Sequence, residues 1–196
     1  MKTFIITLIT CFALPISYAQ ENKFIISTSF RFNNSNSETE IQKHSNNFTQ
    51  INPRIMYKLK NKWGVGFLYA ISKDKTEDND NIYSKLTGNK FGGFIQYNLI
   101  DITKFQLFSE LNASYTTLKH KSEMDTFNDI SSKGAFLNIN MGARYNLYKR
   151  FGIELRLNDL ISYSSTKLDV SETKSSSFNL LNNPFQQLSY GISYSF

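Results

Sequence analysis

The stretch LSYGISYSF, residues 188–196, decides the fold of this chain. Its large apolar residues recur at every second position: Leu188, Tyr190, Ile192, Tyr194 and Phe196. Successive side chains of a β-strand point to opposite faces, so one face of this strand is apolar and aromatic while the other is small and polar. A strand whose apolar face meets lipid and whose polar face meets a lumen is typical of a membrane-spanning β-barrel.

Seven upstream segments alternate in the same way and are rich in aromatic and β-branched residues. With the last strand, the segments cover residues 24–32, 48–59, 63–72, 90–99, 105–115, 135–147, 151–160 and 188–196. Each is about ten residues long, which suffices to cross a bilayer when the strand is tilted. We therefore expect an all-β fold, an eight-stranded antiparallel up-and-down transmembrane β-barrel.

The connections between these segments alternate between long and short, as in bacterial barrels with short periplasmic turns and long extracellular loops. We expect long loops at residues 33–47, 73–88, 118–133 and 163–183. Within the second segment, Pro53 cannot donate a ladder hydrogen bond, so we expect it at a bulge or near a rim.

The amino-terminal residues predict a cleaved signal peptide, residues 1–19. A positive start at Lys2 is followed by the apolar residues 4–16 and by a small-x-small cleavage site, Ser17-Tyr18-Ala19. An amino-terminal membrane anchor is the alternative, but the flanking residues fit cleavage better. The mature domain would then be residues 20–196, exported and without cysteine, because Cys11 is the only one in the chain.

The net charge of +6 would suit a nucleic-acid ligand. The basic residues, however, are divided between short turns and inward strand positions, and the long loops look close to neutral. Since no continuous basic face remains, we expect no nucleic-acid partner.

The inward positions of the predicted strands carry a set of opposite charges: Arg54, Glu110, Arg144, Glu154 and Arg156, with Arg31 near them. An eight-stranded barrel is just wide enough for side chains to fill it, and buried charges must be paired. We therefore expect a polar lumen network that plugs the barrel, with a gated ion path as the alternative. The acidic run Asp78 to Asn81 lacks the glycine and terminal glutamate of an EF-hand, so we expect no metal site and no cofactor.

Two stretches carry a family resemblance: INPRIMYKLKNKWGVGF, residues 51–67, and SYGISYSF, residues 189–196. With them the chain resembles small outer-membrane β-barrels of the Bacteroidetes type, similar in layout to OmpX and to the barrel half of OmpA. The resemblance covers the mature chain and implies a monomer in the bacterial outer membrane, with membrane lipids and the barrel-assembly machinery as partners. It also implies that Tyr190, Ile192, Tyr194 and Phe196 form a carboxy-terminal assembly signal, and that no peptidoglycan-binding domain follows Phe196.

Some eight-stranded barrels are lipid-modifying enzymes, and one deacylase family uses a His-x-Ser pair with a separate glutamate. His120-Lys121-Ser122 fits the pair, but lysines and acids surround it and no glutamate stands at a comparable position in the next strand. General acid–base catalysis needs an oriented group, so we expect no catalytic residues.

These patterns predict a non-enzymatic barrel with a structural or surface-interaction role: envelope integrity, adhesion, or binding of an extracellular partner through four loops. The alternatives are a narrow ion-conducting channel and, behind it, a lipid-modifying enzyme. A soluble lipocalin-like barrel is the alternative fold, and it would have the aromatic faces inside.

Overall fold

A computed structural model describes residues 23–38, 43–60, 62–78, 81–122, 130–148, 150–168, 174–180 and 183–196. The strands are β1 (Phe24–Glu38), β2 (Lys43–Lys58), β3 (Trp63–Asp78), β4 (Asn81–Ile102), β5 (Phe105–Ser122), β6 (Ile130–Tyr148), β7 (Phe151–Leu168), β8 (Lys174–Leu180) and β9 (Leu188–Ser195). A short 3-10 helix, η2 (Pro184–Gln187), leads into β9. No helix in the described ranges is long and apolar enough to cross a bilayer. The expected signal peptide, residues 1–19, lies outside these ranges.

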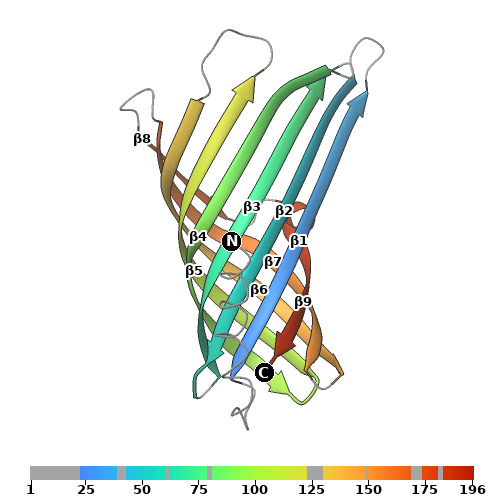
Figure 1. The fold of residues 1–196 in the computed structure, drawn as a ribbon, viewed down its shortest axis with the longest axis vertical. Coiled ribbons are helices and arrows are strands. Elements are labelled where there is room, and N and C mark those ends of the chain that lie inside the picture. Colours follow the sequence, from blue (N-terminus) through green and yellow to red (C-terminus); the bar gives the residue numbers. More distant parts are fainter. Residues whose placement is uncertain are drawn as a thin grey trace, which may run out of the picture.

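Eight of the strands close into a barrel in which the strands are tilted (Figure 1). Each strand from β1 to β7 pairs antiparallel with the next, and β9 pairs with both β7 and β1. At the seam, Phe24 and Phe196 exchange two backbone hydrogen bonds of 2.9 Å. The predicted eight-stranded antiparallel barrel is therefore confirmed.

The strands extend beyond the alternating segments into the expected loops. Where residues 163–183 were expected to be a loop, β7 continues to Leu168 and pairs with β8 over Ile161–Lys167. The expected loops at 33–47, 73–88 and 118–133 are likewise largely strand. Period-two hydrophobicity marks only the part of a strand that touches lipid, because above the membrane both faces meet water and polar residues can continue the ladder.

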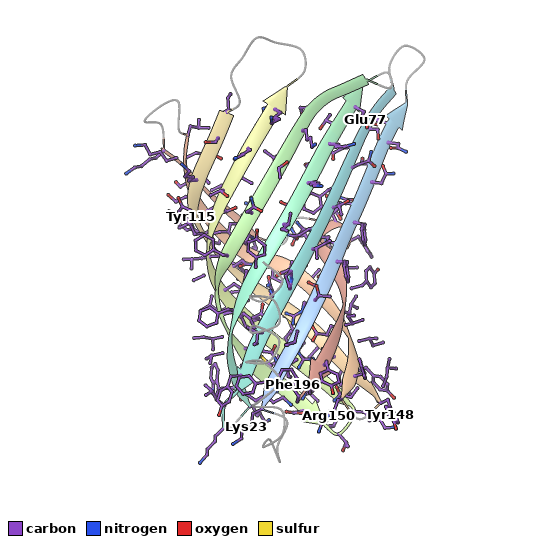
Figure 2. The ribbon with its side chains drawn as sticks, in the orientation of Figure 1. Lys23, Glu77, Tyr115, Tyr148, Arg150 and Phe196 are labelled. Carbon is purple, nitrogen blue, oxygen red and sulfur yellow. The ribbon has the colours of Figure 1, made fainter. Side chains whose placement is uncertain are left out.

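The outer surface is apolar and aromatic, which excludes the lipocalin-like alternative. Phe67 is 73% exposed and Tyr190 is 62% exposed. At the end with the short turns, aromatic side chains of neighbouring strands contact each other, as in the pair Trp63 and Tyr97, with ring centroids 4.7 Å apart. Nearer the loops, Phe91 and Tyr115 form a similar pair at 5.6 Å. Figure 2 shows Tyr148 and Phe196 at the turn end and Tyr115 on the outer surface.

The expectation for Pro53 is wrong. Pro53 lies in the middle of β2, opposite Thr28 of β1, and the register between β2 and β3 is continuous from Ile51–Ile71 to Arg54–Leu68. The proline is accommodated by a local gap in the β2–β3 ladder and not by an inserted residue or a position at the rim.

Candidate functional site

Five charged side chains meet inside the barrel. Arg54 lies on β2, Glu110 on β5, Arg144 on β6, and Glu154 and Arg156 on β7. Alternation turns all five inward, and each is at most 5% exposed. The structure thus places together the five lumen residues that the sequence singled out.

The contacts form an alternating chain of charges. Arg54 Nη1 donates to both carboxylate oxygens of Glu110 at 2.6 Å. Arg156 donates from Nη1 to Glu110 Oε2 at 2.9 Å and from Nη2 to Glu154 Oε2 at 2.8 Å. Arg144 donates from Nε and Nη2 to Glu154 Oε1, each at 2.7 Å. Each carboxylate therefore has two arginine partners, which compensates the loss of its hydration in a buried site.

Two inward phenylalanines pack against the arginines. The Phe94 ring lies under Arg54, with its centroid 5.1 Å from Cζ. The Phe108 ring lies 4.8 Å from Arg156 and 5.6 Å from Arg144. A ring face attracts a guanidinium electrostatically, so these rings stabilise the positive members of the network while filling the lumen. Alternation along β4 and β5 puts both rings on the lumen face.

An apolar layer accompanies the charges inside the barrel. Ile25, Met56, Leu68 and Phe94 form a buried cluster. Alternation places all four on the lumen face, so their inward position can be predicted from the sequence.

Toward the turn end, the network continues through neutral groups. Arg144 Nη1 donates to Gln106 Oε1 at 3.0 Å, and Gln106 donates to Asp101 at 3.0 Å. Asn98 also donates to Asp101, at 3.1 Å, and accepts from Gln96 at 2.8 Å. Asp101 precedes the short turn between β4 and β5, so the network reaches the turn end of the barrel.

Toward the loops, the network continues through asparagine side chains. Asn140 donates to Glu110 Oε1 at 3.3 Å, and Asn138 donates to Asn140 at 2.8 Å and to Asp159 at 2.7 Å. Asp159 also faces Arg31 Nη1 at 3.6 Å. A string of polar contacts therefore joins the turn end of the lumen to its mouth.

A bulge in β7 puts Asp159 at this position. β6 pairs Ile139 with Ile161 and Met141 with Leu157, so three residues of β7 face the single residue Asn140. Asp159 takes a left-handed conformation, with φ 54°, and its N–H donates to Asn140 Oδ1 at 2.8 Å. Aspartate tolerates this conformation better than most residues. Period-two reasoning cannot locate such a bulge.

The mouth of the barrel holds a polar cavity of about 610 Å³. Its wall includes Arg31, Asp159, Asp74, Phe48 and the 3-10 helix η2. Arg31 lies 4.5 Å from the Phe48 ring centroid. Arg31 Nε and Asp74 Oδ1 are buried there without a hydrogen-bond partner in the described ranges, and burial raises the pKa of Asp74. The cavity therefore offers both a donor and an acceptor to a polar ligand.

The lumen below the cavity is tightly filled. Phe108 is 0% exposed, and Arg156 and Glu110 are each 1% exposed. Bulk water does not reach these side chains, as expected for an eight-stranded barrel whose own residues fill it.

The candidate catalytic pair lies at the loop end of β5. His120 pairs with Leu86 and Ile130 across the ladder, and in the described ranges no hydrogen bond or ion pair orients its ring. The side chains of Ser122 and of His44 lie outside the description. No group of three or more histidine, cysteine or acidic side chains in the described ranges is placed to hold a metal ion.

Comparisons with known proteins agree with this geometry. Residues 4–196 match the family described as outer membrane protein beta-barrel domain. The chain is similar to the solved outer membrane protein OprG from Pseudomonas aeruginosa, with 18% identity and a TM-score of 0.51, over 90% of this chain and 96% of that one. It is also similar to Ail, the attachment invasion locus protein of Yersinia pestis, with 19% identity and a TM-score of 0.48, over 90% and 100%. No curated protein matches the chain.

The likeness to OprG supports the barrel fold. The family match covers nearly the whole sequence and accounts for the apolar outer surface and the closed ladder. The chain therefore belongs to the outer membrane protein beta-barrel family, and its place is the bacterial outer membrane.

Proposed function

We propose that this protein is a closed, non-enzymatic barrel with a structural or surface-interaction role, exercised at its extracellular end. The observation that carries the proposal is the ion-pair network of Arg54, Glu110, Arg156, Glu154 and Arg144, which fills the lumen. A barrel plugged by paired charges gives solutes no free path. The surface available for a function is therefore the outer end of the barrel. The contribution would be to envelope integrity, adhesion or binding of an extracellular partner.

The extracellular end has the features that binding needs. The polar cavity opens there, and the paired strands that lead into the connections extend beyond their lipid-facing part. Binding residues are commonly carried by loops on a rigid scaffold.

The same proposal includes the finer assignments from the sequence. The protein would be of the Bacteroidetes type, similar in layout to OmpX and the OmpA barrel, with a signal peptide at residues 1–19 and a mature domain at 20–196. It would be a monomer inserted by the barrel-assembly machinery, which would recognise Tyr190, Ile192, Tyr194 and Phe196. The outward direction of Tyr190 and Ile192, which are 62% and 59% exposed, supports such a signal.

Replacing the loops tests the proposal. Each connection that contains residues 39–42, 79–80, 123–129 or 169–173 is replaced in turn by a short Gly-Ser turn in the full chain. We expect all four variants to retain a heat-modifiable band on SDS gels, and at least one to lose adhesion or envelope integrity in cells. Four variants that fold and retain both properties would contradict a role for the loops.

A narrow ion-conducting channel is the second candidate, because the polar contacts run without a break from Asp101 to Asp159. Planar-bilayer recordings decide between the two. We expect wild-type protein and the Glu110→Gln and Arg144→Gln variants to give no unitary currents. If the wild type gives current steps whose conductance changes in either variant, the protein is a channel and the proposal of a plugged barrel is wrong.

A further inference from the structure

The mouth cavity of about 610 Å³ has one wall made by the upper parts of β1, β2 and β3. Arg31, Asn33 and Ser35 are two residues apart on β1, so alternation turns all three toward the cavity. The ladders place Asn33 opposite Phe48 of β2, and Phe48 opposite Asp74 of β3. This wall is therefore a regular array of side chains, spaced about 5 Å apart between strands and about 7 Å apart along a strand.

The rest of the described lining comes from β7 and η2, and internal contacts hold both in place. Asn158 of β7 donates to Gln187 O and to Ser189 Oγ, each at 2.9 Å, and so fastens η2 to β7. Asp159 accepts from Asn138 at 2.7 Å. Because these parts of the wall are fixed in advance, a ligand can bind with little loss of entropy in the protein.

The ionisable side chains at the mouth balance each other. In the described lining, Arg31 is the cation, and Asp74 and Asp159 are the carboxylates. Lys90 of β4 lies one inward row lower, with Nζ 3.8 Å from the centroid of the Phe136 ring. These two cations and two carboxylates leave the described part of the mouth without surplus charge. Electrostatic complementarity therefore favours a neutral ligand over an anion or a cation.

Arg31 offers one hydrogen-bond donor to such a ligand. Its Nη1 lies 3.6 Å from Asp159 Oδ2, and its Cζ lies 4.5 Å from the centroid of the Phe48 ring. These contacts hold the guanidinium in position, while its Nε is buried with no hydrogen-bond partner in the described ranges. A donor that is already oriented can bond a ligand at little cost in side-chain entropy.

Asp74 offers the matching acceptor. The residues opposite it on the two ladders are Phe48 and Leu86, whose side chains have no hydrogen to donate. Its Oδ1 is buried and has no hydrogen-bond partner among the described residues. A buried acceptor without a partner costs stability, and proteins keep such costs chiefly where function needs the group. Asp74 therefore points to a ligand that brings a donor.

The neutral side chains of the lining narrow the class of ligand. Asn33, Asn46, Asn183 and Gln186 are amides, which both donate and accept hydrogen bonds. A hydroxyl group does the same, whereas an ammonium group only donates and a carboxylate only accepts. A molecule with hydroxyls on neighbouring carbons can therefore satisfy the amides, the arginine and the aspartate together. The volume of the cavity lies in the range of about 300–1,000 Å³ that is usual for small-molecule sites.

We propose that the mouth cavity binds a short, soluble, neutral saccharide. Arg31 Nε donates to one hydroxyl oxygen, Asp74 Oδ1 accepts from a second hydroxyl, and the amides of β1 and β2 bond the hydroxyls between them. This inference rests on the proposed binding role of the extracellular end, for which it names the class of ligand.

Saturation-transfer difference NMR tests binding by the full chain. Wild-type protein in phosphatidylcholine nanodiscs is mixed in turn with maltotriose, mannotriose and galactotriose, and with trigalacturonic acid and chitosan trimer as acidic and cationic probes of the same length. We expect saturation transfer to at least one neutral trisaccharide, above the level in empty nanodiscs and stronger than to either charged probe. Absence of transfer to all three neutral probes, or stronger transfer to a charged one, would overturn the proposal.

Two tryptophan variants of β1 test where the saccharide binds. Asn33→Trp places a large side chain in the cavity and should abolish saturation transfer to the neutral probe. Asn34→Trp is the matched control, because the next residue of the strand is exposed on the outward face. The control should keep both the NMR signal and the heat-modifiable band. Equal signals from the two variants would show that the saccharide does not occupy the cavity.

Asp74→Asn tests the acceptor with nearly the same side-chain shape. It should weaken binding of the neutral probe by roughly tenfold or more, as expected when a hydrogen bond to a charged group is lost. Without saccharide, its urea midpoint should be at or above that of the wild type, because Oδ1 has no partner in the described ranges. Glu77→Gln, at the loop end of the same strand (Figure 2), is the control and should leave the affinity unchanged. An unchanged affinity or a lower midpoint for Asp74→Asn would contradict the assignment of Asp74.

This inference and the proposed extracellular role can fail separately. If no neutral probe binds the wild type while a loop replacement still removes adhesion, the saccharide site is wrong and the extracellular role stands. If a neutral probe binds while all four loop variants keep adhesion and envelope integrity, the saccharide site stands and the role given to the loops is wrong.

Discussion

Gly142 and Phe108 show how the lumen accommodates its aromatic rings. A β-carbon at Gly142 would lie 2.5 Å from Phe108 Cζ, and one at Gly66 would lie 2.6 Å from Phe94 Cζ. These are the two rings on which the lumen arginines rest. The inward glycines therefore provide the space that lets each guanidinium stack on a ring.

Adding a methyl group at Gly142 should destabilise the barrel. We expect Gly142→Ala to lower the free energy of unfolding by about 1–3 kcal/mol, because the buried ring has no room to move. The control is Gly93→Ala, where the nearest atom to the new β-carbon is Gly66 O at 3.6 Å. Urea titration in vesicles, followed by the fluorescence of the single tryptophan, Trp63, gives both midpoints. Coincident midpoints would refute this account of Gly142.

Glu110 is the carboxylate on which two arginines converge. Glu110→Gln should destabilise the barrel by about 3–5 kcal/mol, because Arg54 and Arg156 would each remain buried without a charged partner there. Asn112→Ala is the matched control on the same lumen face, since both polar side-chain atoms of Asn112 lack a hydrogen-bond partner among the described residues. In the same urea titration, the control should shift the unfolding midpoint only slightly. A midpoint shift as large as that of Glu110→Gln would contradict the prediction.

The charges of the lumen could be assigned from alternation, whereas their contacts could not. Arg54 and Glu110 are 56 residues apart, and their contact depends on how β2 and β5 face each other across the closed lumen. That geometry depends on the register offset between each pair of neighbouring strands, summed around the barrel. The stacking of the Phe94 and Phe108 rings on these arginines depends on the same geometry and could not be predicted either.

Strand type and order could be predicted, but strand length and β8 could not. Alternation located the lipid-facing part of every barrel strand and failed above the membrane, where β4 begins at Asn81 instead of Lys90. β8 has no alternation to detect, and all of its residues are exposed. Among the described residues it pairs with β7 alone, so it adds a hairpin above the membrane without contributing to barrel closure.

Proline substitutions distinguish a closing strand from an added one. Phe178 of β8 and Ile192 of β9 are both exposed, at 66% and 59%. Because Ile192 pairs with Thr28 on one side and Ile153 on the other, Ile192→Pro should break the seam and abolish the heat-modifiable band. Phe178→Pro should leave the band in place. Two variants with the same gel mobility shift would show that β8 and β9 do not differ in this way.

Along its height, the barrel has an apolar outer belt and, at the loop end, a polar mouth. The location in the outer membrane could be predicted because lipid contact leaves a periodic signature in the sequence. The partner of the proposed binding surface could not be predicted, since a binding surface built from polar residues has no sequence period.

The pairing of β1 with β9 brings the two ends of the described chain within hydrogen-bonding distance, which makes the barrel suitable for circular permutation. A short linker from Phe196 to Phe24, with new termini opened at residues 79–80, would keep every ladder of the barrel. We expect this permutant to refold in detergent micelles with a heat-modifiable band. In cells, where the aromatic end of β9 would now be internal, the exported permutant should fail to reach the outer membrane. Normal insertion in cells would contradict this prediction, because it would show that assembly does not require the aromatic strand to lie at the end of the chain.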